Sequence, residues 1–105
     1  MDIEEFAQMV LAQQKARIAA LYSQEQADAE TVQVRPGKVY TKVDIGPAHN
    51  ISGKFMVETE TGIIYGIKAY GKVHKGHVYG TLDTTADWYW GEYYPQQLRS
   101  GVQAG

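Results

Sequence analysis

The chain of 105 residues contains no cysteine, which excludes disulfide scaffolds, thiolate metal sites and cysteine nucleophiles together. It has no apolar run long enough to span a bilayer, and its first residues are acidic where a secretory signal would be basic. It also lacks a nucleophile elbow and a phosphate loop of Walker spacing. We therefore expect a cytoplasmic protein without membrane association, enzymatic activity or cofactor.

Charge is low and unevenly distributed along the chain. Residues 1–31 hold two basic and six acidic side chains, a net charge of −4, whereas the remaining residues carry +2. With 44% hydrophobic residues the chain can form one modest core, so we expect one domain over residues 1–95. The last ten residues, 96–105, are polar and glycine-bearing and are expected to form a loosely ordered tail.

The first part of the chain has the pattern of an amphipathic helix over about residues 2–26. Asp2 and Glu5 have capping-box spacing at its start. Apolar residues recur at the helical period, interrupted only by Gln14. This stripe is expected to pack on a sheet; the alternative is pairing with a partner helix or with a second copy in a homodimer. An acidic polar face argues against a membrane-surface helix.

The period changes to two after Thr31, and turn signals follow at intervals up to about residue 90. This pattern predicts an antiparallel β-meander of about five strands over residues 32–90. The fold class is α+β: a helix packed on a small, coiled sheet, with an SH3-like or OB-like partial barrel as one form. Glycines inside the strands favour strong coiling.

Two turn assignments predict the register of the central hairpins. A three-residue loop over residues 60–62, with Gly62 left-handed, places Val57 opposite Tyr65. A two-residue turn at residues 75–76 places His74 opposite His77. Both assignments put the odd-numbered residues 63–69 on the core face.

The opposite face of the hairpins is the predicted partner-binding surface, because it combines cations with flat rings. Two tryptophans near the C-terminus complete this surface, unless they close the core instead. The predicted binding residues are Lys54, Lys68, Tyr70, Lys72, His74, His77, Tyr79, Trp88 and Trp90.

The three histidines raise the possibility of a metal site. His74 and His77 are predicted to face each other, and His49 lies in a loop. No cysteine is available and no carboxylate is clearly adjacent, so we predict no metal site and treat the pair as the rim of a contact surface.

Four segments of the β half, residues 53–60 (GKFMVETE), 62–71 (GIIYGIKAYG), 77–83 (HVYGTLD) and 87–90 (DWYW), resemble small accessory proteins of tailed bacteriophages, especially those of actinobacteria. The resemblance does not cover the helix. Such proteins share no agreed catalytic motif, so the resemblance assigns no site residue in this chain. It implies a non-enzymatic protein acting in the host cytoplasm. We therefore expect binding to a host or phage protein, with DNA or RNA as the alternative partner.

Overall fold

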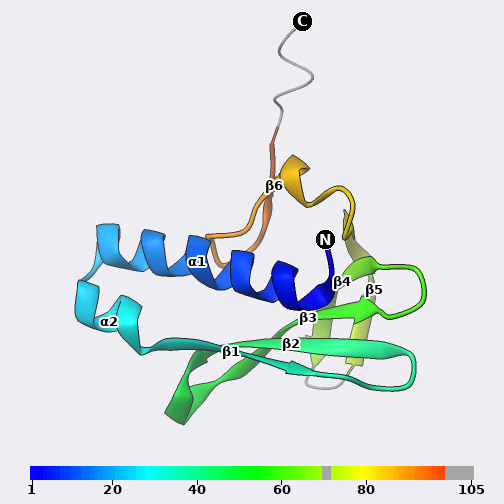
Figure 1. Ribbon diagram of the computed structural model, residues 1–105, viewed down its shortest axis with the longest axis horizontal. Helices are drawn as coiled ribbons and strands as arrows, with labels where there is room; N and C mark the ends of the chain where they lie inside the picture. Colours follow the sequence, from blue (N-terminus) through cyan, green and yellow to red (C-terminus); the bar gives the residue numbers. More distant parts are fainter. Residues whose placement is uncertain (70–71, 99–105) are drawn as a thin grey trace, which may run out of the picture.

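Two helices precede a five-stranded antiparallel sheet in the computed structural model, which describes residues 1–69 and 72–98. The strands pair in chain order, β1-β2-β3-β4-β5, so the predicted α+β meander is confirmed (Figure 1). The elements are α1 (Ile3–Leu21), α2 (Gln24–Ala29), β1 (Glu30–Arg35), β2 (Tyr40–Pro47), η1 (Ala48–Asn50), β3 (Ser52–Glu58), β4 (Ile63–Ala69), β5 (Lys72–Thr81), η2 (Thr85–Asp87), β6 (Trp88–Tyr89) and β7 (Gln96–Gln97).

The predicted single helix over residues 2–26 is in fact two helices. Its start is as expected: the Asp2 side chain accepts from the Glu5 amide at 2.7 Å, and Glu5 Oε1 accepts from the Asp2 amide at 2.9 Å. At the other end Ser23 adopts extended backbone angles, and its hydroxyl accepts from the Gln26 amide at 3.0 Å. This side-chain bond caps a new helix and replaces the continuation of α1.

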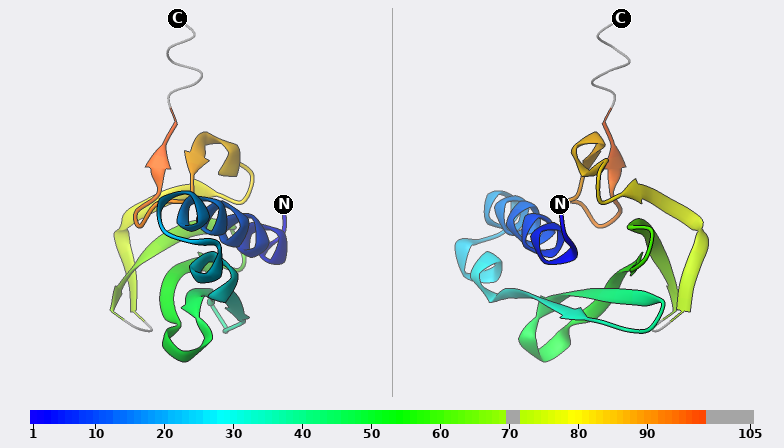
Figure 2. Two further views of the ribbon diagram at one scale, coloured as in Figure 1. Left: turned by 90° about the vertical axis from the view of Figure 1, so that its left-hand side faces the viewer. Right: turned by 45° about the vertical axis from the view of Figure 1, so that its right-hand side comes forward.

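The sheet curves around α1, which lies against its concave face (Figure 2). Phe6 and Val10 of α1 meet Phe55 of β3 and Ile64 of β4 in a core whose largest fully buried side chain is Trp90. The ring centroids of Phe6 and Phe55 lie 4.9 Å and 5.4 Å from that of Trp90, all edge to face. The apolar stripe of α1 therefore packs on the sheet. Gln14, the interruption in the stripe, is buried with it.

The register between β3 and β4 differs by one residue from the prediction. Met56 lies opposite Tyr65 and Val57 opposite Ile64. Gly62 is left-handed as expected, with φ +77°, but its amide donates to the Glu58 carbonyl at 2.8 Å, so the connection is longer than three residues. The slip brings the even-numbered residues of β4 to the core face, and Ile64 is fully buried.

The predicted turn at residues 75–76 is wrong, because β5 runs without interruption through these residues. Ile67 lies opposite Val73 and Tyr65 opposite Val78, so the two strands are not connected by a turn at residues 75–76. Gly66 faces His74, and residues 75–77 have no partner on β4. They form an irregularity of the β-bulge type within one long strand.

After β5 the chain crosses back over the core and ends in a small second sheet. Trp88 pairs with Gln97 and Tyr89 with Gln96, and the Leu98 amide donates to the Asp87 carbonyl at 2.7 Å. Residues 96–98 of the predicted tail are thus ordered by strand pairing. Within the described part of the chain β1 does not pair with β5, so the curved sheet does not close into a barrel.

Candidate functional site

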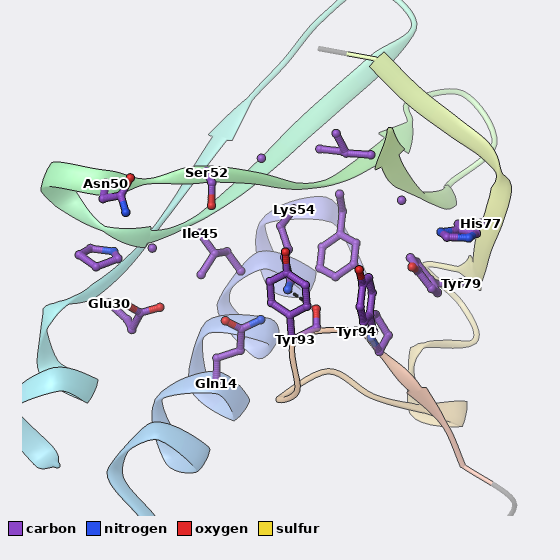
Figure 3. A pocket seen from close by; sticks show the side chains of 17 residues that line it. Gln14, Glu30, Ile45, Asn50, Ser52, Lys54, His77, Tyr79, Tyr93 and Tyr94 are labelled. Carbon is purple, nitrogen blue, oxygen red and sulfur yellow. Dashed lines mark hydrogen bonds between the residues drawn. The ribbon is translucent and has the colours of Figure 1, made fainter. Parts of the chain in front are cut away.

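A cavity of about 400 Å³ opens on the concave side of the sheet, between α1 and the loop after β2 on one side and β5 with the C-terminal segment on the other. Glu30 and Asn50 lie at one end in Figure 3, and His77 and Tyr79 at the other. Lys54, Tyr93 and Tyr94 lie between these ends. The volume is in the range of small-ligand pockets.

Lys54 reaches this cavity because of a bulge in β3. Val43 of β2 pairs with Phe55 and Asp44 pairs with Gly53, which leaves Lys54 without a partner on β2. Both Lys54 and its neighbour Phe55 consequently line the concave side. Simple alternation along the strand cannot produce this arrangement.

The Lys54 ammonium is partly desolvated. It donates to the Tyr93 carbonyl and lies 4.5 Å from the centre of the Tyr93 ring. Among residues 1–69 and 72–98, no acidic side chain forms an ion pair with it. Burial lowers the pKa of Lys54, because the charged form loses solvation that no anion replaces.

Aromatic rings surround this cation. The Tyr93 and Tyr94 rings meet edge to face at 4.8 Å, and both side chains are mostly exposed. His77 and Tyr79 approach from β5, with ring centroids 6.5 Å apart. Burial raises the pKa of Tyr79, and the nearby Tyr94 raises it further by a smaller amount. The Tyr79 phenol therefore stays neutral and can donate a hydrogen bond.

The far end of the cavity holds a carboxyl group. Burial raises the pKa of Glu30, and the Lys15 charge lowers it to a smaller extent. Figure 3 places Glu30 away from Lys54, on the other side of Gln14. The cavity is therefore positive where the tyrosines gather and acidic only at its opposite end.

Beyond the cavity, the β4–β5 hairpin carries basic charge alone. The sequence from residue 62 to residue 82 contains three lysines and two histidines but no aspartate or glutamate. Lys68, Lys72 and Lys75 are exposed. The positive potential of the hairpin is thus not offset by acids within it.

The nine residues predicted to bind a partner occupy different environments. Lys68, Lys72 and His77 are exposed, His74, Tyr79 and Trp88 are partly buried, and Lys54 is held by Tyr93. Tyr70 lies outside the described residues. Trp90 is fully buried, so its side chain belongs to the core and presents no surface.

Of the residues predicted on the hairpin face, His77 and Tyr79 lie on the concave side that continues from the core, whereas Lys68 and Lys72 are exposed and do not line the cavity. His77 and Tyr79 line the cavity together with Gly66. The one-residue slip between β3 and β4 explains the difference, because it turns this face from solvent toward α1.

His74 and His77 do lie together, although across a bulge and not across a turn. Their rings stack with centroids 4.1 Å apart and an interplanar angle of 16°. Parallel stacked rings do not aim their nitrogens at one shared ion. Among the described residues no group of three histidines, aspartates or glutamates is arranged to hold a metal.

Tyr93, Tyr94 and Glu30 also line the cavity but were not among the predicted binding residues. The crowding of aromatic residues after Asp87 was the available signal for the two tyrosines. No sequence signal was available for Glu30, because its position depends on how α2 leads into β1. Trp90 is fixed by α1 in a similarly nonlocal way: its amide donates to Gln13 Oε1 at 2.7 Å.

No protein-family model, no curated protein and no solved structure matches this chain. No helix in the described ranges has the length and apolarity that a membrane span requires. Among the described residues lining the cavity, no hydroxyl or amine hydrogen-bonds to a histidine or carboxylate. The cavity lining offers a positive charge at Lys54, tyrosine hydroxyls and flat rings.

Proposed function

We propose that the protein is a non-enzymatic binding protein whose concave β-surface takes single-stranded nucleic acid. The observation that carries this proposal is the partly desolvated Lys54 ammonium, which pairs with no carboxylate in the described part of the chain and lies beside exposed tyrosines. A partly buried cation without a counter-ion is costly, and an anionic ligand relieves that cost. Phosphate groups meet this requirement, and bases supply rings for stacking.

The hairpin extends the same chemistry outward from the cavity. Lys68, Lys72 and Lys75 would follow the backbone of a bound strand, while His77 and Tyr94 offer ring faces or edges to the bases. Curved antiparallel sheets that bind single strands combine cations and aromatics in this way. A duplex fits less well, because it exposes no unstacked bases to the tyrosines.

The sequence analysis favoured a host or phage protein as partner, and this remains the second candidate function. The burial of Trp90 removes one expected anchor, but the exposed pair Tyr93 and Tyr94 is typical of a protein contact surface. The resemblance to phage accessory proteins fits either partner in a host cytoplasm.

Fluorescence anisotropy with labelled 12-nucleotide DNA and RNA strands, and with the matching duplex, tests the proposal. Single strands should bind more tightly than the duplex, and raising the salt from 50 to 200 mM should weaken binding about tenfold or more. Lys72→Glu and Tyr94→Ala should each weaken single-strand binding. Arg17→Glu, a charge reversal on α1 away from the cavity, is the matched control and should bind like the wild type.

Two results would overturn the proposal: no binding of any strand at 50 mM salt, or equal losses for Arg17→Glu and Lys72→Glu. In either case the protein-partner candidate is tested by capture from host lysate with wild type and with a Tyr93→Ala/Tyr94→Ala double variant. Specific capture that the double variant abolishes would support the second candidate.

A further inference from the structure

The two edges of the sheet are built differently. β5 forms one edge and carries Lys72, Lys75, an internal Gly76 and the irregularity over residues 75–77. Lysines and bulges of this kind protect a strand against pairing with another chain. β1 forms the other edge and has none of these devices: its register with β2 is regular over all six pairs, and it contains neither proline nor glycine.

The outer side of β1 is open within the described part of the chain, where no strand pairs with it (Figures 1 and 2). Its side chains alternate between exposed and half-buried. Val32 and Val34 pack against the core but keep part of their surface exposed. An added strand would cover this apolar surface and satisfy the unpaired backbone groups.

Charge around β1 is arranged so that a second copy fits. The chain entering the strand is acidic, with Glu25, Asp28 and Glu30, whereas the chain leaving it holds Lys38 and Arg35, of which Arg35 also forms an ion pair with Asp44. Antiparallel pairing of β1 with itself brings the acidic end of each copy beside the basic end of the other. The interface is then complementary to itself, as a two-fold axis requires.

We propose that two copies of this chain associate through antiparallel β1–β1 pairing, forming one ten-stranded sheet with its two-fold axis at Gln33. This register sets Val32 opposite the partner's Val34, so apolar meets apolar on the concave side. An axis at Val32 would set Glu30 opposite the partner's Val34, and an axis between residues would mix the two faces. The proposal is independent of the ligand proposed above.

The axis position gives a specific test, because at Gln33 a side chain meets its own copy. Gln33 is exposed, but its side chain accepts a hydrogen bond from Arg35 and it lies opposite Asp44 of β2, so the folding of each charged variant has to be checked against the wild type. Gln33→Lys and Gln33→Glu should each weaken dimerisation about threefold or more, since like charges face one another across the ladder. An equimolar mixture of the two variants should restore association, because opposite charges then meet.

Analytical ultracentrifugation from 5 µM to 1 mM protein measures these equilibria, with circular dichroism as the check on folding. A short edge pairing buries little area, so the wild type should dimerise weakly, at tens to hundreds of micromolar. Gln8→Lys and Gln8→Glu place the same charges on the exposed surface of α1 and should not alter association.

Three outcomes would overturn the proposal. The wild type stays monomeric at 1 mM, the dimer is insensitive to charge at Gln33, or the mixture of variants associates no better than either variant alone. The second outcome would place the dimer contact on another surface, such as the exposed end of α1 at Leu21 and Tyr22.

Discussion

Replacing Trp90 by alanine should remove a large part of the stability of this domain. The side chain is fully buried, contacts Phe6 and Phe55, and donates its indole N–H to the Thr85 carbonyl at 3.0 Å. Truncating a buried tryptophan costs about 3–5 kcal/mol, including the cavity that it leaves. The Thr85 carbonyl keeps its hydrogen bond from the Trp88 amide, so losing the indole donor adds little to this cost.

The total free energy of unfolding of such a domain is about 5–15 kcal/mol, so this loss is a large fraction of it. At about 4 °C per kcal/mol for a chain of this length, the melting temperature should fall by about 12 °C or more. Urea denaturation and thermal melting, both followed by far-UV circular dichroism, measure the change.

Two further variants keep the test decisive if Trp90→Ala does not fold. Trp90→Phe retains an aromatic ring but loses the indole donor, and should show an intermediate loss. Tyr22→Ala removes an aromatic ring that is 67% exposed and should change the unfolding free energy by less than about 1 kcal/mol. If Trp90→Ala were as stable as Tyr22→Ala, the packing of the C-terminal segment into the core would be refuted.

Two other perturbations follow from buried groups. Burial raises the pKa of Asp44, which is 1% exposed, more than the Arg35 guanidinium at 3.2 Å lowers it. A raised carboxyl pKa means that the folded state holds its proton to higher pH than the unfolded state, so the stability contributed by Asp44 falls as pH rises from about 4 through the folded pKa. Urea denaturation between pH 4 and 8 measures the unfolding free energies of the wild type and of Asp44→Asn. The wild-type value minus the variant value should decline as pH rises, and an increase would contradict a raised pKa of Asp44. Gly80→Ala should lower the unfolding free energy by about 1–3 kcal/mol in the same assay, because φ of Gly80 is +82° and the new Cβ would lie 2.4 Å from Thr84 Oγ1. If the variant were as stable as the wild type, the strain expected at this position would be refuted.

Much of the local structure could be predicted from the sequence. The capping box of Asp2 and Glu5 marks the start of α1, and Gly62 is left-handed as its turn requires. The predicted grouping of Gly66 with His77 and Tyr79 is also found, because all three line the cavity. Each of these features depends on a few neighbouring residues, or on pairing within one hairpin.

The candidate site could be predicted only in part. The sequence placed lysines, histidines and tyrosines on one face, but it could not show that this face is concave and continuous with the core. Lys54 enters the cavity through a bulge that depends on pairing with β2, and Tyr93 holds it there. Neither the pairing with β2 nor the contact with Tyr93 can be predicted from the spacing of residues along β3.

The sequence by itself determined the α+β class, a helix followed by an antiparallel meander, and the start of α1, because capping, helical periodicity and strand alternation act over short distances. Only the tertiary structure decided the register between β3 and β4. Apolar residues occupy both parities there, at Phe55, Met56 and Val57 and again from Ile63 to Ile67, so alternation favours neither register. The choice depends on which register packs best against α1 and Trp90, and that one-residue difference brings Gly66 to the concave side with His77 and Tyr79.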